Sequence, residues 1–226
     1  MMLSASTLAN WTTRSRPERR PLHGRYVRLE PLDPIRHGPD LFAAGSGPEA
    51  SGLWRYLPEP PFYDRNDFEE WLNKVSRSED PLFFAAVDQI THRAEGRIAL
   101  MRIDTANGVI ETGNILFGPR LARTRAATEA IYLVGCYVFD ELKYRRLEWK
   151  CNDLNEPSKR AALRLGFTFE GLFRQHMVVK GENRDTAWFS MLDYEWLLLK
   201  RSFERWLDTS NFDNAGQQLM HLRECI

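Results

Sequence analysis

The stretch from residue 81 to residue 117 constrains the fold more than any other part of this sequence. It contains three apolar or alternating segments typical of strands, PLFFAAV (81–87), GRIALMRID (96–104) and VIETGNILF (109–117). The connections between them are too short to hold a crossover helix, so neighbouring strands must run antiparallel. The sequence therefore predicts an antiparallel meander in the middle of the chain.

Segments with helical or strand periodicity flank this meander on both sides. Before it we expect a strand that ends at Pro31 and two short helices, one near 39–44 and one starting at Asp64. After it we expect a long helix, a strand, a compact helix, two strands and a further helix, at 124–143, 146–152, 155–167, 176–181, 185–192 and 195–207. The prediction is an α+β fold with a mixed, mostly antiparallel central sheet of about six or seven strands flanked by helices.

Three parts of the chain differ in character. Residues 1–20 end in the polar, proline-interrupted run RSRPERRP and are expected to form a flexible N-terminal arm. Residues 21–194 hold the strands and helices of the predicted sheet and form one domain. Residues 195–226 add a C-terminal helical extension, whose aromatic face is compatible with either a monomer or a homodimer.

The charge and cysteine content argue against several classes of protein. The 31 basic residues balance the 31 acidic ones, so a nucleic-acid partner is not expected. The three cysteines are scattered, and the five histidines lack metal-ligand spacing, so we expect neither disulfides nor a metal site. No apolar run reaches the ~18 residues of a membrane helix, and no signal peptide is recognisable. These features indicate a cytoplasmic protein with no membrane partner.

Three motifs occur in a characteristic order: VIETGNILFGP (109–119), ATEA (127–130) and NEPSKRAALRLGFTFEG (155–171). Together with the order of elements, they resemble the GNAT superfamily of N-acetyltransferases over about residues 21–194. Within it, the chain looks like the branch that acetylates ribosomal-protein N-termini and small amines. The resemblance implies acetyl-CoA as co-substrate and a small-molecule amine or a peptide N-terminus as acceptor.

The resemblance also implies which residues hold the coenzyme. A strand end should run beside the pantetheine arm, and the start of the long helix should bind the pyrophosphate, because its free N–H groups and partial positive charge attract anions. The residues expected to contact the coenzyme are Ile115, Leu116, Phe117, Arg120, Arg123, Thr124, Arg125, Ala126, Ala127, Thr128 and Asn155.

The helix start departs from the family pattern Gln/Arg-x-x-Gly-x-Gly/Ala. Ala122 stands at the Gln/Arg position, Arg125 at the first Gly and Ala127 at the last. Losing the glycine removes a residue that tolerates unusual backbone angles and close ligand approach. Two interpretations follow: the Arg125 guanidinium compensates as a phosphate donor, or the loop no longer binds coenzyme well.

Two residues are the candidates for catalysis. An alkylammonium has a pKa near ~10, so a carboxylate must take a proton from the acceptor. We expect Glu111 in this role, since strict alternation places it on the same strand face as Gly113 and Ile115; otherwise it is a surface carboxylate. Many family members protonate the leaving thiolate with a tyrosine, but Ala162 stands at that position, which leaves Ser158, itself also a possible helix cap.

The acceptor pocket is expected to involve Trp54, Tyr56 and Phe62, in the stretch WRYLPEPPFY. The alternative for each of these aromatics is core packing. The changed helix start and the missing tyrosine also leave a second function open, a catalytically weak, acyl-CoA-binding regulatory domain of the same fold.

Overall fold

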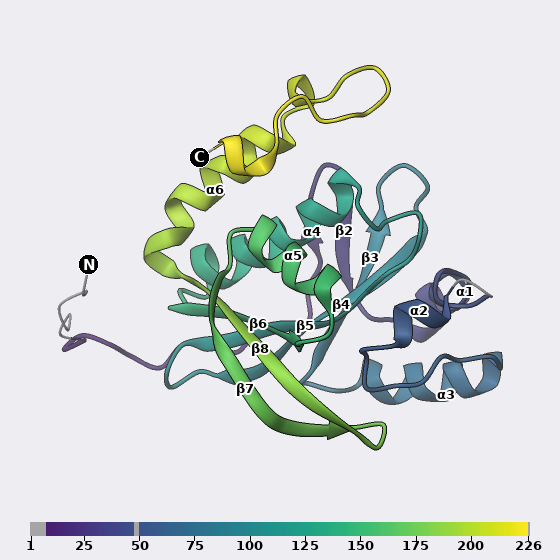
Figure 1. Ribbon diagram of the computed structural model, residues 1–226. Helices are drawn as coiled ribbons and strands as arrows, with labels where there is room; N and C mark the ends of the chain where they lie inside the picture. The colour runs from purple at the N-terminus through teal and green to yellow at the C-terminus, as the bar shows by residue number, and fades with distance from the viewer. Residues whose placement is uncertain (1–7, 48–49, 226) are drawn as a thin grey trace.

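The computed structural model describes residues 8–47 and 50–225. Within them lies one eight-stranded sheet in the order β1-β2-β3-β4-β5-β6-β8-β7 (Figure 1). Strands β5 and β6 run parallel, and every other neighbouring pair of this sheet runs antiparallel. The strands are β1 (Leu22–His23), β2 (Val27–Pro31), β3 (Leu82–Asp88), β4 (Ala94–Asp104), β5 (Val109–Phe117), β6 (Arg146–Asn152), β7 (Thr168–Val179) and β8 (Glu182–Leu192).

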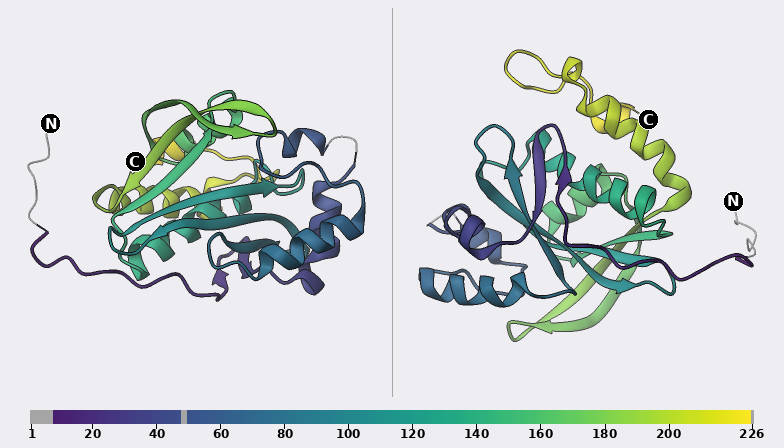
Figure 2. Two further views of the ribbon diagram at one scale, coloured as in Figure 1. Left: turned by 90° about the horizontal axis from the view of Figure 1, so that it is seen from below. Right: turned by 180° about the vertical axis from the view of Figure 1, so that it is seen from behind.

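Helices cover both faces of the sheet (Figures 1 and 2). They are α1 (Pro34–Gly45), α2 (Ser51–Trp54), α3 (Arg65–Ser76), α4 (Arg125–Gly135), the π-helical segment η1 (Cys136–Glu141), α5 (Glu156–Arg164), α6 (Asp193–Leu207), and the short 3-10 turns η2 (Thr209–Asn211) and η3 (Leu222–Cys225). None of the described helices combines the length and the apolar character needed to cross a bilayer.

The predicted α+β fold and its central meander are confirmed. The sheet has eight strands rather than six or seven, because the two-residue strand β1 pairs with β2 and is too short to leave a sequence pattern. Strand β7 also begins well before the expected 176–181. The sequence did not indicate its first half, because the side chains there are mostly exposed and show no apolar alternation.

Strand β3 shows why the two helical layers are separate. Its residues Leu82, Phe84 and Ala86 belong to the core beneath α4 and α6, whereas the alternate residues belong to a second core beneath α1 and α3. All of these side chains are buried, as expected for a strand covered on both faces. The aromatic face of α6 packs into the first core of the same chain, where Trp196 and Phe203 are buried, so the packing does not leave that face free for a second copy.

Residues 8–20, for which the sequence predicts a flexible arm, lie along the edge of the domain. The indole Nε1 of Trp11 donates to the carbonyl of Ala106 at 2.7 Å, and the Tyr144 hydroxyl donates to the carbonyl of Ser15 at 3.0 Å. Gly108, with φ +61°, has no room for a Cβ because the Trp11 ring lies against it. These contacts connect the segment to the β4–β5 turn and to the end of η1.

The parallel strands β5 and β6 separate soon after they start, and this separation positions the site. They pair only over Val109–Glu111 and Arg146–Glu148. Beyond that point β5 continues with β4, and β6 continues with β8. A bulge lies in the separated part of β5, where the register with β4 shifts and Asn114 takes a left-handed φ of 49°. The gap leaves backbone N–H and C=O groups on the facing edges without a strand partner.

Candidate active site

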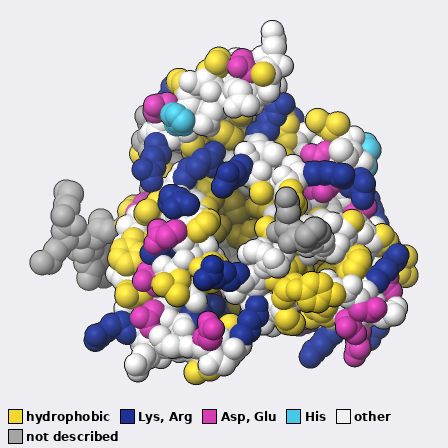
Figure 3. All heavy atoms as spheres, turned by 45° about the vertical axis from the view of Figure 1, so that its right-hand side comes forward, with side chains coloured by type: hydrophobic (Ala, Val, Ile, Leu, Met, Phe, Trp, Pro, Cys, Tyr) yellow, Lys and Arg dark blue, Asp and Glu magenta, His cyan; other side chains and the backbone are white. Residues whose placement is uncertain are grey.

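A cavity of about 770 Å³ opens where β5 and β6 separate, and we call it the α4 cavity. Figure 3 shows a hollow with an apolar floor and several Lys and Arg side chains around its rim. The lining comes from β5, β6, the start of α4, α5 and the C-terminal segment: Ile115, Phe117, Ala122, Arg123, Thr124, Arg125, Ala127, Thr128, Ile131, Trp149, Asn155, Pro157, Ser158, Ala161, Arg164, Leu165, Trp206, Phe212, Gly216, Gln217 and Gln218.

The first turn of α4 presents free N–H groups at this cavity. Thr124 is the N-cap, and its hydroxyl accepts from the N–H of Ala127 at 3.2 Å. The N–H groups of Arg125 and Ala126 have no acceptor among the described residues. Unpaired N–H groups and the positive end of the helix dipole make such a helix start an anion site.

Three arginines in the lining strengthen the positive charge. Arg123, Arg125 and Arg164 have no carboxylate within 4.0 Å among the described residues, and the lining contains neither Asp nor Glu. Arg125 is held between the rings of Tyr26 and Phe212, at 4.8 and 4.9 Å from their centroids. The cavity is therefore built for a ligand with several negative charges.

Arg164 reaches this charge cluster from α5. Its Nη1 donates to the hydroxyl of Thr128 at 3.1 Å, and its guanidinium lies 5.0 Å from the ring centroid of Trp206. Burial lowers the pKa of the Arg164 guanidinium from its usual value. An arginine stays protonated in spite of such a shift, so a partly desolvated cation without a carboxylate faces the cavity.

The lost glycine has a structural explanation. Arg125 occupies the first turn of α4, whose ordinary helical backbone does not need a glycine. The left-handed residue of the loop is instead Arg123, with φ 64°. A non-glycine residue in this region is uncommon and is often found at ligand-binding loops. The loop thus makes its sharp turn one residue before the Thr124 cap and exposes the Arg123 side chain to the cavity.

Ser158 and Asn155 lie at the other wall of the cavity. The Asn155 side chain caps α5 by accepting from the N–H of Ser158 at 3.2 Å. The Ser158 hydroxyl oxygen accepts from the indole Nε1 of Trp149 at 2.9 Å, which leaves the hydroxyl hydrogen available for donation. Asn155 thus combines helix capping with cavity lining, whereas the Ser158 side chain lines the cavity and caps no described backbone N–H group.

Glu111 lies on the other face of β5 from Ile115. The bulge at Asn114 inserts an additional residue, so Glu111 and Gly113 share one face while Ile115 packs with Ile110 toward α4. The expectation of strict alternation through Ile115 is wrong for this reason. Glu111 does not line the α4 cavity but borders the same gap from the opposite side.

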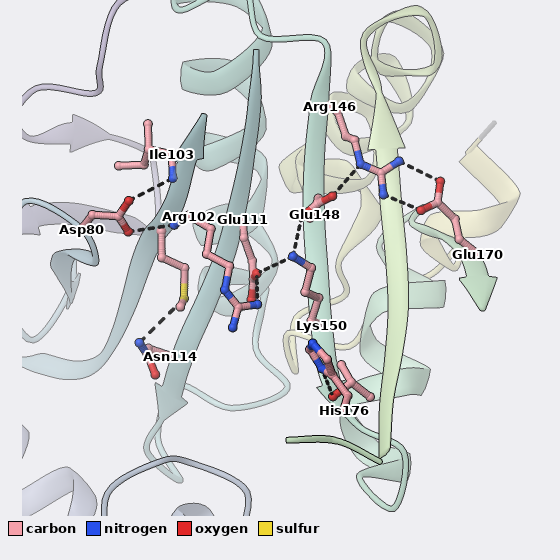
Figure 4. A network of polar contacts seen from close by, with 12 residues as sticks. Asp80, Arg102, Ile103, Glu111, Asn114, Arg146, Glu148, Lys150, Glu170 and His176 are labelled. Carbon is pink, nitrogen blue, oxygen red and sulfur yellow. Dashed lines mark hydrogen bonds and ion pairs between the residues drawn. The ribbon is translucent and has the colours of Figure 1, made fainter. Parts of the chain in front are cut away.

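Glu111 belongs to a buried ion-pair network that we call the Glu111 cluster, Arg102, Glu111, Glu148 and Lys150 (Figure 4). The Lys150 Nζ lies 3.0 Å from the Glu111 Oε2 and 2.6 Å from the Glu148 Oε2. The Arg102 Nη1 donates to the same Glu111 oxygen at 2.8 Å. The Glu111 Oε1 has no hydrogen-bond partner among the described residues, so one carboxylate oxygen remains free.

The sequence did not single out Arg102, Lys150 or His176, which also lies in this region (Figure 4). The His176 Nδ1 is 3.0 Å from the Thr186 hydroxyl. Partial burial, followed by the charges of Arg102, Arg184 and Lys150, lowers the pKa of the His176 imidazole. The alternation of Glu148 and Lys150 in RLEWKCN marks one polar face of β6, and this pattern was the sequence signal that could have pointed to Lys150.

Five of the expected residues place their side chains outside the cavity lining. Leu116 faces the second core, Ala126 is buried in the first, and Arg120 pairs with Glu95 at 3.4 Å. Trp54 is 2% exposed and donates through Nε1 to the Gly45 carbonyl at 2.7 Å, and Phe62 packs edge-on against it. The core-packing alternative describes these two aromatics.

Tyr56, the third acceptor-pocket candidate of that stretch, donates its hydroxyl to the carbonyl of Leu154 at 2.9 Å. It thereby links the α2 region to the loop before α5. Two other acidic residues of this region are held in ion pairs, Asp153 with Lys159 at 3.0 Å and Glu170 with Arg146. Among the described residues there is no group of three or more His, Cys, Asp or Glu side chains that could hold a metal ion.

Comparison with known proteins agrees with this geometry. Residues 27–168 match the family model described as "Acetyltransferase (GNAT) domain". A GCN5-related N-acetyltransferase of Brucella melitensis is 57% identical, with a TM-score of 0.94 over 96% of this chain and 98% of that one. A probable GNAT-family acetyltransferase of Chromobacterium violaceum is 40% identical, with a TM-score of 0.79 over 87% and 98%.

A curated relative gives the same result at lower similarity. It is named "Uncharacterized N-acetyltransferase p20", comes from Bacillus licheniformis, and is 30% identical over 154 residues, which are 67% of this chain and 84% of the relative. The family match covers the separated strands, the start of α4 and the whole of α5. The chain belongs to the GNAT family of acetyltransferases.

Proposed function

We propose that the protein transfers an acetyl group from acetyl-CoA to a primary amine, by direct attack of the amine on the thioester. One observation carries this proposal: three arginines that have no carboxylate partner within the described part of the chain surround the free end of α4, in a cavity that continues into the gap between β5 and β6. Coenzyme A has the matching chemistry, with charged phosphates at one end and an extended, amide-bearing arm at the other.

In this proposal the phosphates bind at α4 and the arm enters the gap. The N–H groups of Arg125 and Ala126 and the guanidinium groups of Arg123, Arg125 and Arg164 hold the diphosphate. Ile115, Phe117 and Asn155 contact the pantetheine, whose amides can pair with the free strand edges. A backbone N–H beside the bulge would stabilise the oxyanion that forms on the thioester carbonyl.

The acceptor approaches from the side of the Glu111 cluster. Glu111 takes a proton from the acceptor through its free Oε1, directly or through a water molecule. Arg102 and Lys150 hold the other oxygen and fix the orientation of the carboxylate. The β7–β8 hairpin closes this side, where the Lys180 Nζ donates to the carbonyl of Trp54 at 2.8 Å. This enclosure suits a small amine or the first residues of a peptide, as in the ribosomal-protein branch.

Ser158 protonates the departing thiolate through its hydroxyl hydrogen. The neighbouring thiol of Cys151 supports direct transfer rather than an acyl-enzyme. Burial raises the pKa of Cys151, and the nearby Ser158 hydroxyl only partly opposes this. A thiol that stays protonated is a poor nucleophile, so the acetyl group passes to the amine in one step.

Two measurements test the proposal. Acetyl-CoA at a hundred times its dissociation constant is expected to stabilise the fold by ~2.7 kcal/mol in thermal unfolding. Thiol release is then measured with a panel of polyamines, amino acids and N-terminal peptides. Binding without thiol release from any amine would favour the regulatory-domain alternative, and no stabilisation at millimolar acetyl-CoA would contradict both functions.

A further inference from the structure

The C-terminal segment supplies one wall of the α4 cavity although it lies beyond the matched family domain. The wall residues are Trp206, Phe212, Gly216, Gln217 and Gln218, whereas the family model ends at residue 168. In Figure 1 this segment projects from α6 at the end of the molecule opposite the β7–β8 hairpin. A second, independent part of the chain therefore completes the cavity.

Residues 212–218 form a small preorganised hairpin. Phe212 and Gln218 are joined by an antiparallel bridge. The Asp213 carboxylate accepts from the N–H groups of Ala215 and Gln217, at 2.9 and 2.8 Å, and the turn passes through Gly216 with φ 75°.

The hairpin is also fixed to α6. The indole Nε1 of Trp206 donates to the Gln218 Oε1 at 2.9 Å, and the Trp206 and Phe212 rings meet edge-on at 5.2 Å. Trp206 itself is buried. The hairpin thus needs no ordering when a ligand arrives, which lowers the entropic cost of binding.

The hairpin lies next to the positive end of the cavity rather than next to the strand gap. Phe212 contacts the Arg125 guanidinium, and Trp206 contacts that of Arg164. The gap, by contrast, is lined by Ile115 and Trp149. An extended ligand with its diphosphate at the α4 start and its thioester in the gap must therefore direct its remaining end toward the hairpin.

We propose that the C-terminal hairpin, residues 212–218 with Trp206 beneath it, binds the adenosine end of coenzyme A and makes the protein discriminate against pantetheine thiols that lack it. The proposal rests on the function proposed above. The partly exposed Phe212 ring offers an apolar surface to the base. The Gln217 carboxamide, without a side-chain hydrogen bond among the described residues, offers both a donor and an acceptor to the base or ribose.

Calorimetric titration with coenzyme A and with 4′-phosphopantetheine tests the proposal on the full chain. We expect the wild type to bind coenzyme A more tightly. Phe212→Ala is expected to weaken coenzyme A binding about tenfold, and Gln217→Ala about threefold. In both variants the affinity for phosphopantetheine is expected to stay within about twofold of the wild-type value. Among the described residues, Gln217 forms hydrogen bonds only through its own backbone N–H and C=O groups, so we expect its alanine variant to fold normally. Asn214→Ala, exposed on the same hairpin but outside the cavity lining, is the control and is expected to behave as wild type.

The outcomes separate this inference from the function on which it rests. Equal wild-type affinities for the two thiols, or losses shared equally by both thiols in the hairpin variants, would overturn the role of the hairpin and leave acetyl-CoA binding intact. A wild-type protein that binds neither thiol would instead overturn the proposed function.

Discussion

The α4 cavity and the Glu111 cluster share strand β5, yet their charges are arranged in opposite ways. The described residues that line the cavity include three arginines and no carboxylate, whereas each carboxylate of the cluster contacts a cation within 3.0 Å. Unbalanced positive charge is useful only for a ligand that brings its own negative charge. In the Glu111 cluster, the balanced charges fix the positions of the side chains and leave the Glu111 Oε1 available for proton transfer. This difference assigns coenzyme binding to the α4 cavity and proton transfer to the Glu111 cluster, on opposite sides of one gap in the sheet.

The strongest test of this separation is Glu111→Gln. Loss of a general base costs about 10²–10⁴-fold in rate, so we expect turnover to fall at least ~100-fold while coenzyme affinity stays within twofold. Steady-state kinetics and calorimetry measure the two effects. Asp153→Asn, an exposed carboxylate paired with Lys159, is the matched control and keeps its turnover. A parallel loss of coenzyme affinity in Glu111→Gln would mean that the two sides are not separate.

The converse change is Arg164→Gln on the cavity side. A hydrogen bond to a charged group contributes about 1.5–3 kcal/mol, so coenzyme affinity is expected to fall about 10- to 100-fold with little change in kcat at saturation. Arg120→Gln is the control, because Arg120 pairs with Glu95 outside the cavity. Unchanged affinity in Arg164→Gln would remove this arginine from the phosphate site.

Ser158→Ala sharpens the comparison, because Ser158 lines the cavity but acts on the chemical step. We expect kcat to fall about tenfold, less than the about 10²–10⁴-fold typical of general acid–base catalysis, with coenzyme affinity unchanged. Ser158→Thr keeps the hydroxyl and is expected to recover part of the rate. The same loss of rate in both variants would point to packing against Trp149 rather than to proton donation.

The smallest expected effect concerns pH. The pKa of His176 is lowered from its usual value, so above the ordinary histidine range the imidazole is neutral and adds no titration step. In the folded state its neutral form is favoured, so any related loss of stability begins as the pH falls through the ordinary histidine pKa and ends below the lowered pKa of the folded state. His176→Gln should therefore keep the shape of the wild-type kcat/KM profile against pH. Loss of an acidic limb in His176→Gln would make this histidine the base instead.

Local patterns were sufficient to predict most of the fold. Asp64 and Asn155 cap α3 and α5 as their positions before apolar-periodic segments indicate. The cavity contacts of Arg123 and Arg125 also follow from their place at the start of the long helix.

What could not be predicted depends on long-range packing. The bulge at Asn114 reverses the faces of β5 and moves Glu111 away from Ile115, and no residue type in VIETGNILF requires it. Phe212 reaches Arg125 from the other end of the chain, and no periodicity connects segments so far apart. Trp54 is buried by contacts from α1 that its proline-rich surroundings do not indicate.

A crystal structure with saturating acetyl-CoA tests the central claim most directly. We predict the diphosphate on the N–H groups of Arg125 and Ala126, with the thioester in the gap between β5 and β6 and Glu111 on its far side. A structure in which the start of α4 carries no phosphate, with the arginine side chains folded across it, would contradict the account.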